Sequence, residues 1–130
     1  MWYIEAIKDQ SGVMSQSQDN FKRGTAELLI LYLLQEEELY GYRIIQLFNE
    51  KSGGRYTMLE GTLYTILFRL ENAGFVSQRV ELVGKKRTRR VYNITDSGRK
   101  YLETLIREYD EIVAGVDMIL DRRGGADLEE

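Results

Sequence analysis

The sequence predicts a mainly α-helical domain with a small β-hairpin, and three observations lead to this fold class. Three segments with helical spacing of apolar residues come first, a stretch in which every second residue is apolar follows, and one long helical segment comes last. At 130 residues, of which 43% are hydrophobic and 30% are charged, the chain has the size and composition of one soluble globular domain.

Three helices are predicted over residues 21–35, 40–52 and 59–72. The first repeats apolar residues at helical spacing in Ala26, Leu29, Ile30, Leu33 and Leu34. In the third, Leu63, Ile66, Leu67 and Leu70 share one face. Because the chain contains no proline, glycines and an acidic turn at Glu36–Glu38 separate these helices.

The period changes from helical to alternating after Gly74. Val76, Gln78, Val80 and Leu82, followed later by Tyr92 and Ile94, place every second residue on one side, which is typical of two hairpin strands. Residues 83–88 are predicted to form the connecting loop.

A last helix is predicted over residues 96–122, with Thr95 as its N-cap and Asp96 placed favourably in its first turn. Its apolar residues alternate steps of three and four, the heptad spacing of a helix that packs along another helix. We expect a second copy of the chain as the partner and residues 123–130 as a frayed tail. The predicted dimerisation residues are Leu102, Leu105, Tyr109, Ile112, Val116 and Ile119.

Three helices followed by a hairpin is the order of a winged helix-turn-helix, here predicted over residues 21–95, in which the third helix enters the major groove of DNA. The hairpin loop supports this interpretation, because residues 85–90 hold five of the 18 basic residues of a chain with net charge -3. Lys85, Lys86, Arg87 and Arg89 are predicted to contact phosphates. A solvated charged turn is the alternative.

On the third helix, Thr62, Tyr64, Thr65 and Arg69 are predicted to contact DNA with hydroxyl and guanidinium groups. The alternative is that Tyr64 packs against Phe68 and that the threonines are ordinary surface residues. Double-stranded DNA is the expected partner. A winged-helix module that binds protein instead of DNA is the main alternative function.

The composition disfavours other classes of function. The chain has no cysteine and no histidine, which removes thiolate metal sites and the commonest general base, so we expect no enzyme, no metal and no cofactor. Carboxylates at Glu36–Glu38, or Glu60 with Glu71, are most simply solvated. The longest apolar run has seven residues, too few for a membrane span, so we expect a cytoplasmic protein.

Five separated stretches resemble the PadR family of transcriptional regulators, in order and with the family's spacing. The resemblance covers about residues 21–120 and points to the smaller subgroup with a single C-terminal dimerisation helix. The stretches are Arg23-Gly24-Thr25-Ala26-Glu27-Leu28-Leu29, Tyr40-Gly41-Tyr42, Gly61-Thr62-Leu63-Tyr64, Arg69-Leu70-Glu71 with Gly74, and Arg89-Arg90-Val91-Tyr92-Asn93-Ile94-Thr95 with Gly98.

The resemblance implies a homodimeric repressor of a palindromic operator that a small hydrophobic or aromatic effector releases. Tyr101, Tyr109 and Met118 either line an effector pocket between the subunits or form dimer core, and we favour core. Leu59 stands where a helix cap is expected, so Thr57 or water is expected to cap instead.

Residues 1–20 lie outside the resemblance as an N-terminal extension. Two interpretations remain open: the extension docks on the dimer, with Trp2 and Tyr3 beside an effector pocket, or it reflects a misassigned start codon. A partly ordered tail is favoured over docking.

Overall fold

The computed structural model describes residues 16–122, and it confirms a mainly helical fold with a small antiparallel sheet. Predictions for residues 1–15, including Trp2 and Tyr3, and for residues 123–130 lie outside the described residues. The elements are α2 (Gln16–Lys22), α3 (Thr25–Glu36), β1 (Leu39–Tyr40), α4 (Gly41–Lys51), α5 (Glu60–Asn72), β2 (Val76–Val83), β3 (Arg87–Ile94) and α6 (Asp96–Ile119).

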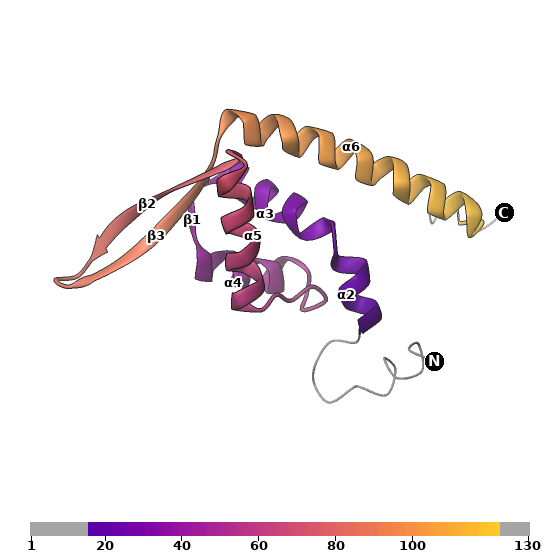
Figure 1. Cartoon of the computed structure of the whole chain (residues 1–130). Helices are drawn as coiled ribbons and strands as arrows, with labels where there is room; N and C mark the ends of the chain where they lie inside the picture. Colours follow the sequence, from indigo (N-terminus) through magenta and orange to yellow (C-terminus); the bar gives the residue numbers. More distant parts are fainter. Residues whose placement is uncertain (1–15, 123–130) are drawn as a thin grey trace.

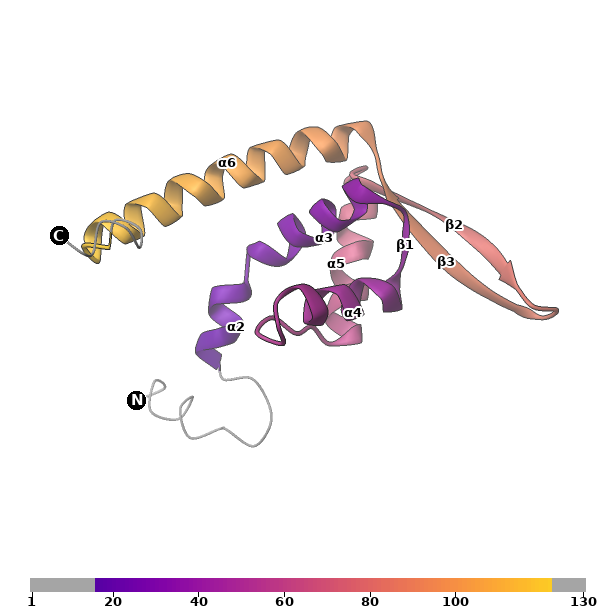
Figure 2. The same ribbon diagram turned by 180° about the vertical axis from the view of Figure 1, so that it is seen from behind.

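Helices α3, α4 and α5 pack together into the body of the domain, and the β2–β3 hairpin projects from it to one side (Figure 1). We call this hairpin the wing. Helix α3 lies between α6 and the start of α5. Helix α6 then extends beyond the body, away from the wing, as the view from behind also shows (Figure 2). The wing and the start of α5 are therefore free of α6.

Two boundaries differ from the sequence predictions. The first predicted helix was expected to begin at Phe21, but Phe21 lies in α2 and the next helix begins at Thr25. Gly24 separates the two helices. Its φ of 91° is left-handed, a conformation that glycine adopts easily and that ends a helix. The expected extension boundary at residue 20 therefore falls inside α2.

The sheet has three strands in the order β1-β3-β2, where a two-stranded hairpin was expected. Strand β1 pairs antiparallel with β3 through Leu39↔Tyr92 and Tyr40↔Val91. A strand of two residues has no periodicity to recognise, which is why the sequence did not predict it. Its effect is to fasten the base of the wing to the helical body.

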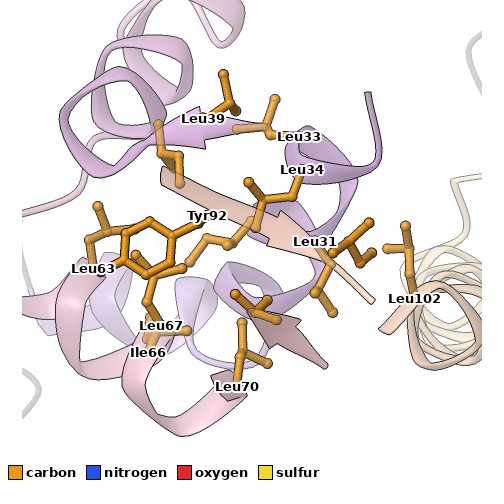
Figure 3. Close-up of a cluster of buried hydrophobic side chains, with 14 of the residues drawn as sticks. Leu31, Leu33, Leu34, Leu39, Leu63, Ile66, Leu67, Leu70, Tyr92 and Leu102 are labelled. Atoms are coloured by element: carbon orange, nitrogen blue, oxygen red, sulfur yellow. The ribbon is translucent and has the colours of Figure 1, made fainter. Parts of the chain in front are cut away.

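One apolar core holds the helices and the base of the sheet together (Figure 3). Leu63, Ile66, Leu67 and Leu70 supply the predicted buried face of α5, and the ring of Tyr92 lies against them. On α3, Ile30, Leu33 and Leu34 of the predicted face are buried, and Leu31, which the pattern had not included, is buried with them. The predicted helical faces are thus confirmed.

Helix α6 begins as predicted, because the Thr95 side chain accepts a hydrogen bond of 3.0 Å from the Gly98 backbone N–H. Leu102 is only 1% exposed within a single subunit, so its prediction as a dimerisation residue is wrong. Leu105 also packs partly against the subunit's own core. Further along, Tyr109, Ile112, Val116 and Ile119 are exposed.

Candidate nucleic-acid interface

Helix α5 presents a face to solvent opposite its buried one. Residues at helical spacing on this outer face are Gly61, Thr65, Phe68 and Asn72, all exposed. The helix begins after Leu59, whose side chain makes no capping hydrogen bond, and capping by Thr57 or water stays a prediction. Glu60 in the first turn suits the positive end of the helix dipole.

The predicted DNA-contact residues of α5 divide between its sides. Thr65 is exposed, but its hydroxyl donates to the Gly61 carbonyl at 2.9 Å. A ligand can then meet only the methyl group of Thr65 and the acceptor lone pairs of its hydroxyl. Thr62 is exposed on the side of the helix that turns toward α3. Only Thr65 therefore lies on the outer face.

Tyr64 packs against α4. Its exposed fraction is 40%, and a Cβ added at Gly41 would overlap its hydroxyl and ring. Gly41 is therefore needed for the close approach of α4 to α5. The position of Tyr64 is explained by this packing, which is different from the Tyr64–Phe68 contact considered from the sequence.

Arg69 connects three helices through one carboxylate. Its guanidinium donates to Glu27 of α3 at 3.0 and 2.6 Å, and the Tyr101 hydroxyl of α6 donates to the same side chain at 3.0 Å. Glu27 is 20% exposed, so this ion pair is sheltered compared with a surface pair. This structural role could not be predicted from the sequence, because the three residues are far apart in the chain.

The wing has two faces, fixed by its register. Gln78 pairs with Tyr92 and bonds to Glu71 of α5 at 3.0 Å, which identifies the side of the wing that faces α5. Alternation places four exposed residues further along that side. This inner face consists of Val80, Leu82, Thr88 and Arg90, and the outer face of Arg79, Glu81, Arg87 and Arg89.

The tip of the wing is shorter than the predicted loop 83–88. Arg87 pairs with Val83 in the ladder, so it lies in β3 and not in the loop. Gly84, with a φ of 74°, Lys85 and Lys86 make the turn. All three basic residues from 85 to 87 are exposed, as phosphate contacts require.

Arg89, on the outer face of the wing, is held against Tyr40 of β1. Its guanidinium lies 3.5 Å from the centre of the Tyr40 ring, and the Tyr40 hydroxyl donates to Glu81. Arg79 bridges Glu81 and Glu38. These hydrogen bonds from Tyr40 and Arg79 lower the pKa of Glu81, which stays ionised at neutral pH. The network stiffens the outer face.

Arg90, which was not among the predicted contacts, is the arginine on the inner face beside α5. Burial raises the pKa of Tyr92, and the neighbouring Arg90 guanidinium partly offsets this effect. Counting alternate residues back from the apolar Tyr92 would have found it, because Tyr92 and Arg90 share a face. Of the two adjacent arginines, Arg89 contacts Tyr40, and Arg90 lies on the face of the wing that turns toward α5.

A groove of about 1090 Å³ opens between the start of α3, the loop before α5 and the side of α5. Thr62 and Arg69 lie along this groove instead of on the outer face of α5. Its apolar lining consists of Ala26, Met58, Leu59 and Ile66, and its basic lining includes Arg23. The groove also reaches Gly61 and Thr65, so a ligand bound there would touch α5 at the start of its outer face.

An exposed helix flanked by a basic wing defines a DNA-binding protein of the winged helix-turn-helix class. The family model "Transcriptional regulator PadR-like family" matches residues 30–104. The chain belongs to this family of transcriptional regulators.

Bacterial relatives agree with this assignment. The transcriptional regulator Rv3488 of Mycobacterium tuberculosis is 34% identical over 74% of this chain and 86% of that protein. A PadR family transcriptional regulator from Eggerthella lenta has a similar structure, with a TM-score of 0.71 and 27% identity over 78% of this chain and 86% of that chain.

Bacillus subtilis PadR, solved in complex with operator DNA, matches with a TM-score of 0.60 and 32% identity. That match covers 63% of this chain and 46% of the other, so this chain spans less than half of that longer protein.

The two glutamates considered as a carboxylate pair are far from each other. Glu60 and Glu71 lie at opposite ends of α5, about 16 Å apart along the helix, so they do not form such a pair. Among residues 16–122, no helix is long and apolar enough to cross a membrane.

Proposed function

We propose that this chain is a homodimeric repressor that binds a palindromic DNA operator through α5 and the wing, and that a small hydrophobic or aromatic effector releases it. The observation that carries the proposal is the far end of the wing, where Lys85, Lys86 and Arg87 are exposed on a hairpin that projects from the body (Figure 1). Operator binding by the related Bacillus subtilis PadR supports it.

The homodimer is supported by the exposed apolar residues Tyr109, Ile112, Val116 and Ile119 on one side of α6. A two-fold dimer presents its two recognition helices about one DNA turn apart, which matches a palindromic site. Selection of bound duplexes from a random pool tests this. A palindromic consensus is the expected result, and a selected pool without two-fold symmetry would contradict the dimeric repressor.

The wing's role is tested by replacing Lys85, Lys86 and Arg87 with alanine. Removing one phosphate contact lowers the slope of log affinity against log salt concentration by about 0.9. The matched control replaces Arg99, Lys100 and Arg107, three exposed basic residues of α6, which removes the same charge away from the wing. Equal slopes for the two triple variants would favour the alternative, a winged-helix module that binds protein.

Effector release is supported by the groove beside α5, which combines apolar lining with contact to the recognition helix. We expect Leu59→Ser, at an exposed apolar position of the groove, to weaken effector binding while operator binding without effector persists. Calorimetry with a panel of small aromatic compounds measures this. If the effector's affinity depended on Tyr109 and not on Leu59, the effector site would lie at the subunit interface instead.

A further inference from the structure

Phe68 occupies an unusual place for a large apolar side chain. It lies on the outer face of α5, one turn beyond Thr65, and 65% of its surface is exposed. Among the described residues it has no ring or cation partner, unlike Phe48 with Tyr56 or Phe75 with Tyr101. Most of its ring therefore contacts water in the free protein, and covering it would be favourable.

The neighbours of Phe68 leave few polar groups on the outer face of α5. The Thr65 hydroxyl donates to the helix backbone, and Gly61 has no side chain and open space around it. Tyr64 is turned to Gly41, and Arg69 is paired with Glu27. Apart from Asn72 near its end and the acceptor lone pairs of the Thr65 hydroxyl, this face therefore contacts a ligand through Phe68 and the Thr65 methyl group.

The charge around this face selects DNA as the occupant. Arg90 lies on the inner face of the wing beside α5, and Lys85, Lys86 and Arg87 lie at the tip. DNA phosphates pair with such basic side chains, and the major groove between the two phosphate backbones is wide enough for a helix. In the major groove, the apolar feature that distinguishes one base pair from the others is the 5-methyl group of thymine.

We propose that Phe68 is a specificity-determining residue that packs on a thymine 5-methyl group in the major groove. This inference rests on the proposed function, because it needs α5 to enter DNA. It predicts that the centre of α5 recognises the base sequence by shape and apolar contact, whereas the sequence alone predicted contacts through hydroxyl groups. Gly61 lets the helix approach the bases closely at its start.

The test uses the full-length protein and the duplex selected from a random pool. Each thymine is replaced in turn by uracil, which removes only the 5-methyl group, and dissociation constants are measured for the wild type, Phe68→Ala and Val80→Ala. Val80 is the matched control, since it is 63% exposed and apolar but lies on the wing.

At one position or more in each half-site, we expect uracil to weaken wild-type binding about fourfold, the value of one buried methyl group at about 0.8 kcal/mol. Phe68→Ala should lose this penalty, whereas Val80→Ala should keep it. Circular dichroism checks that both variants fold, as expected for exposed positions.

Two results overturn the inference while operator binding stands. One is a wild type that binds every uracil duplex as tightly as the thymine duplex. The other is a Phe68→Ala variant that keeps the full penalty, or binds all duplexes as the wild type does, which would assign Phe68 to a protein partner. Failure of the wild type to select any duplex would instead refute the proposed function together with this inference.

Discussion

The two halves of α6 continue one heptad pattern but lie in different surroundings. In the first half, Leu102 is 1% exposed and Tyr101 stacks on Phe75 with ring centres 4.2 Å apart. In the second half, Ile112 is 68% exposed and Ile119 is 87% exposed. Periodicity identifies the apolar side of a helix, but it does not identify the surface that this side meets.

This difference gives the two halves separate expected roles. The first half completes the core of its own subunit, and the second half carries an apolar side that nothing in residues 16–122 of the same subunit covers. The second copy of the chain in the proposed homodimer would cover it. Substitutions in the two halves should therefore change different measured quantities.

The largest effect is expected in the first half. Leu102→Ala removes a buried side chain and leaves a cavity between α6 and α3, which should lower the free energy of unfolding by about 3 to 5 kcal/mol. Urea denaturation measures this value. Glu103→Ala, at the exposed neighbouring position, is the control and should change the free energy of unfolding by less than about 0.5 kcal/mol. Equal effects of the two changes would contradict the described packing.

In the second half, Ile112→Ala should weaken self-association without unfolding the subunit. The change removes about 1.5 kcal/mol of apolar burial per copy, and a two-fold interface loses it twice. The dimer dissociation constant should therefore rise on the order of a hundredfold. Sedimentation analysis at several concentrations measures it. Glu111→Ala, on the same turn and also exposed, is the control. A monomeric wild type, or an unchanged dissociation constant, would remove Ile112 from the dimer face.

The sequence was sufficient for what depends on local periodicity. The helical faces of α3 and α5, the hairpin and the Thr95 cap were all predicted, because each leaves a repeating or capping pattern within a few residues. The dimerisation residues beyond Leu105 remain a prediction, since one subunit cannot test them.

Contacts between distant segments were not predictable in the same way. Tyr64 with Gly41, and Arg69 with Glu27 and Tyr101, depend on how helices cross. The choice between Arg89 and Arg90 depends on which side of the wing faces α5. Alternation had put them on opposite faces, but only the contact of Gln78 with Glu71 fixed which one is inner.

The smallest effect is expected for Tyr101→Phe, at the boundary between the two halves. The change keeps the stacking on Phe75 and removes only the hydrogen bond to Glu27, which still pairs with Arg69. The free energy of unfolding should fall by about 1 kcal/mol, and self-association should not change. Loss of dimerisation in this variant would show that Tyr101 belongs to the second half instead.

Raising the pH sharpens this last test. Burial, followed by the hydrogen bond to Glu27, raises the pKa of Tyr101 above its ordinary value of 10.0. A raised pKa means that the folded state holds the proton more tightly, so this contribution to stability is complete below about pH 10 and is lost as the pH rises through the folded pKa. The advantage of the wild type over Tyr101→Phe should therefore shrink as the pH rises above about 10. A constant difference between the two proteins would mean that the Tyr101 hydroxyl is as solvated in the folded state as in the unfolded chain.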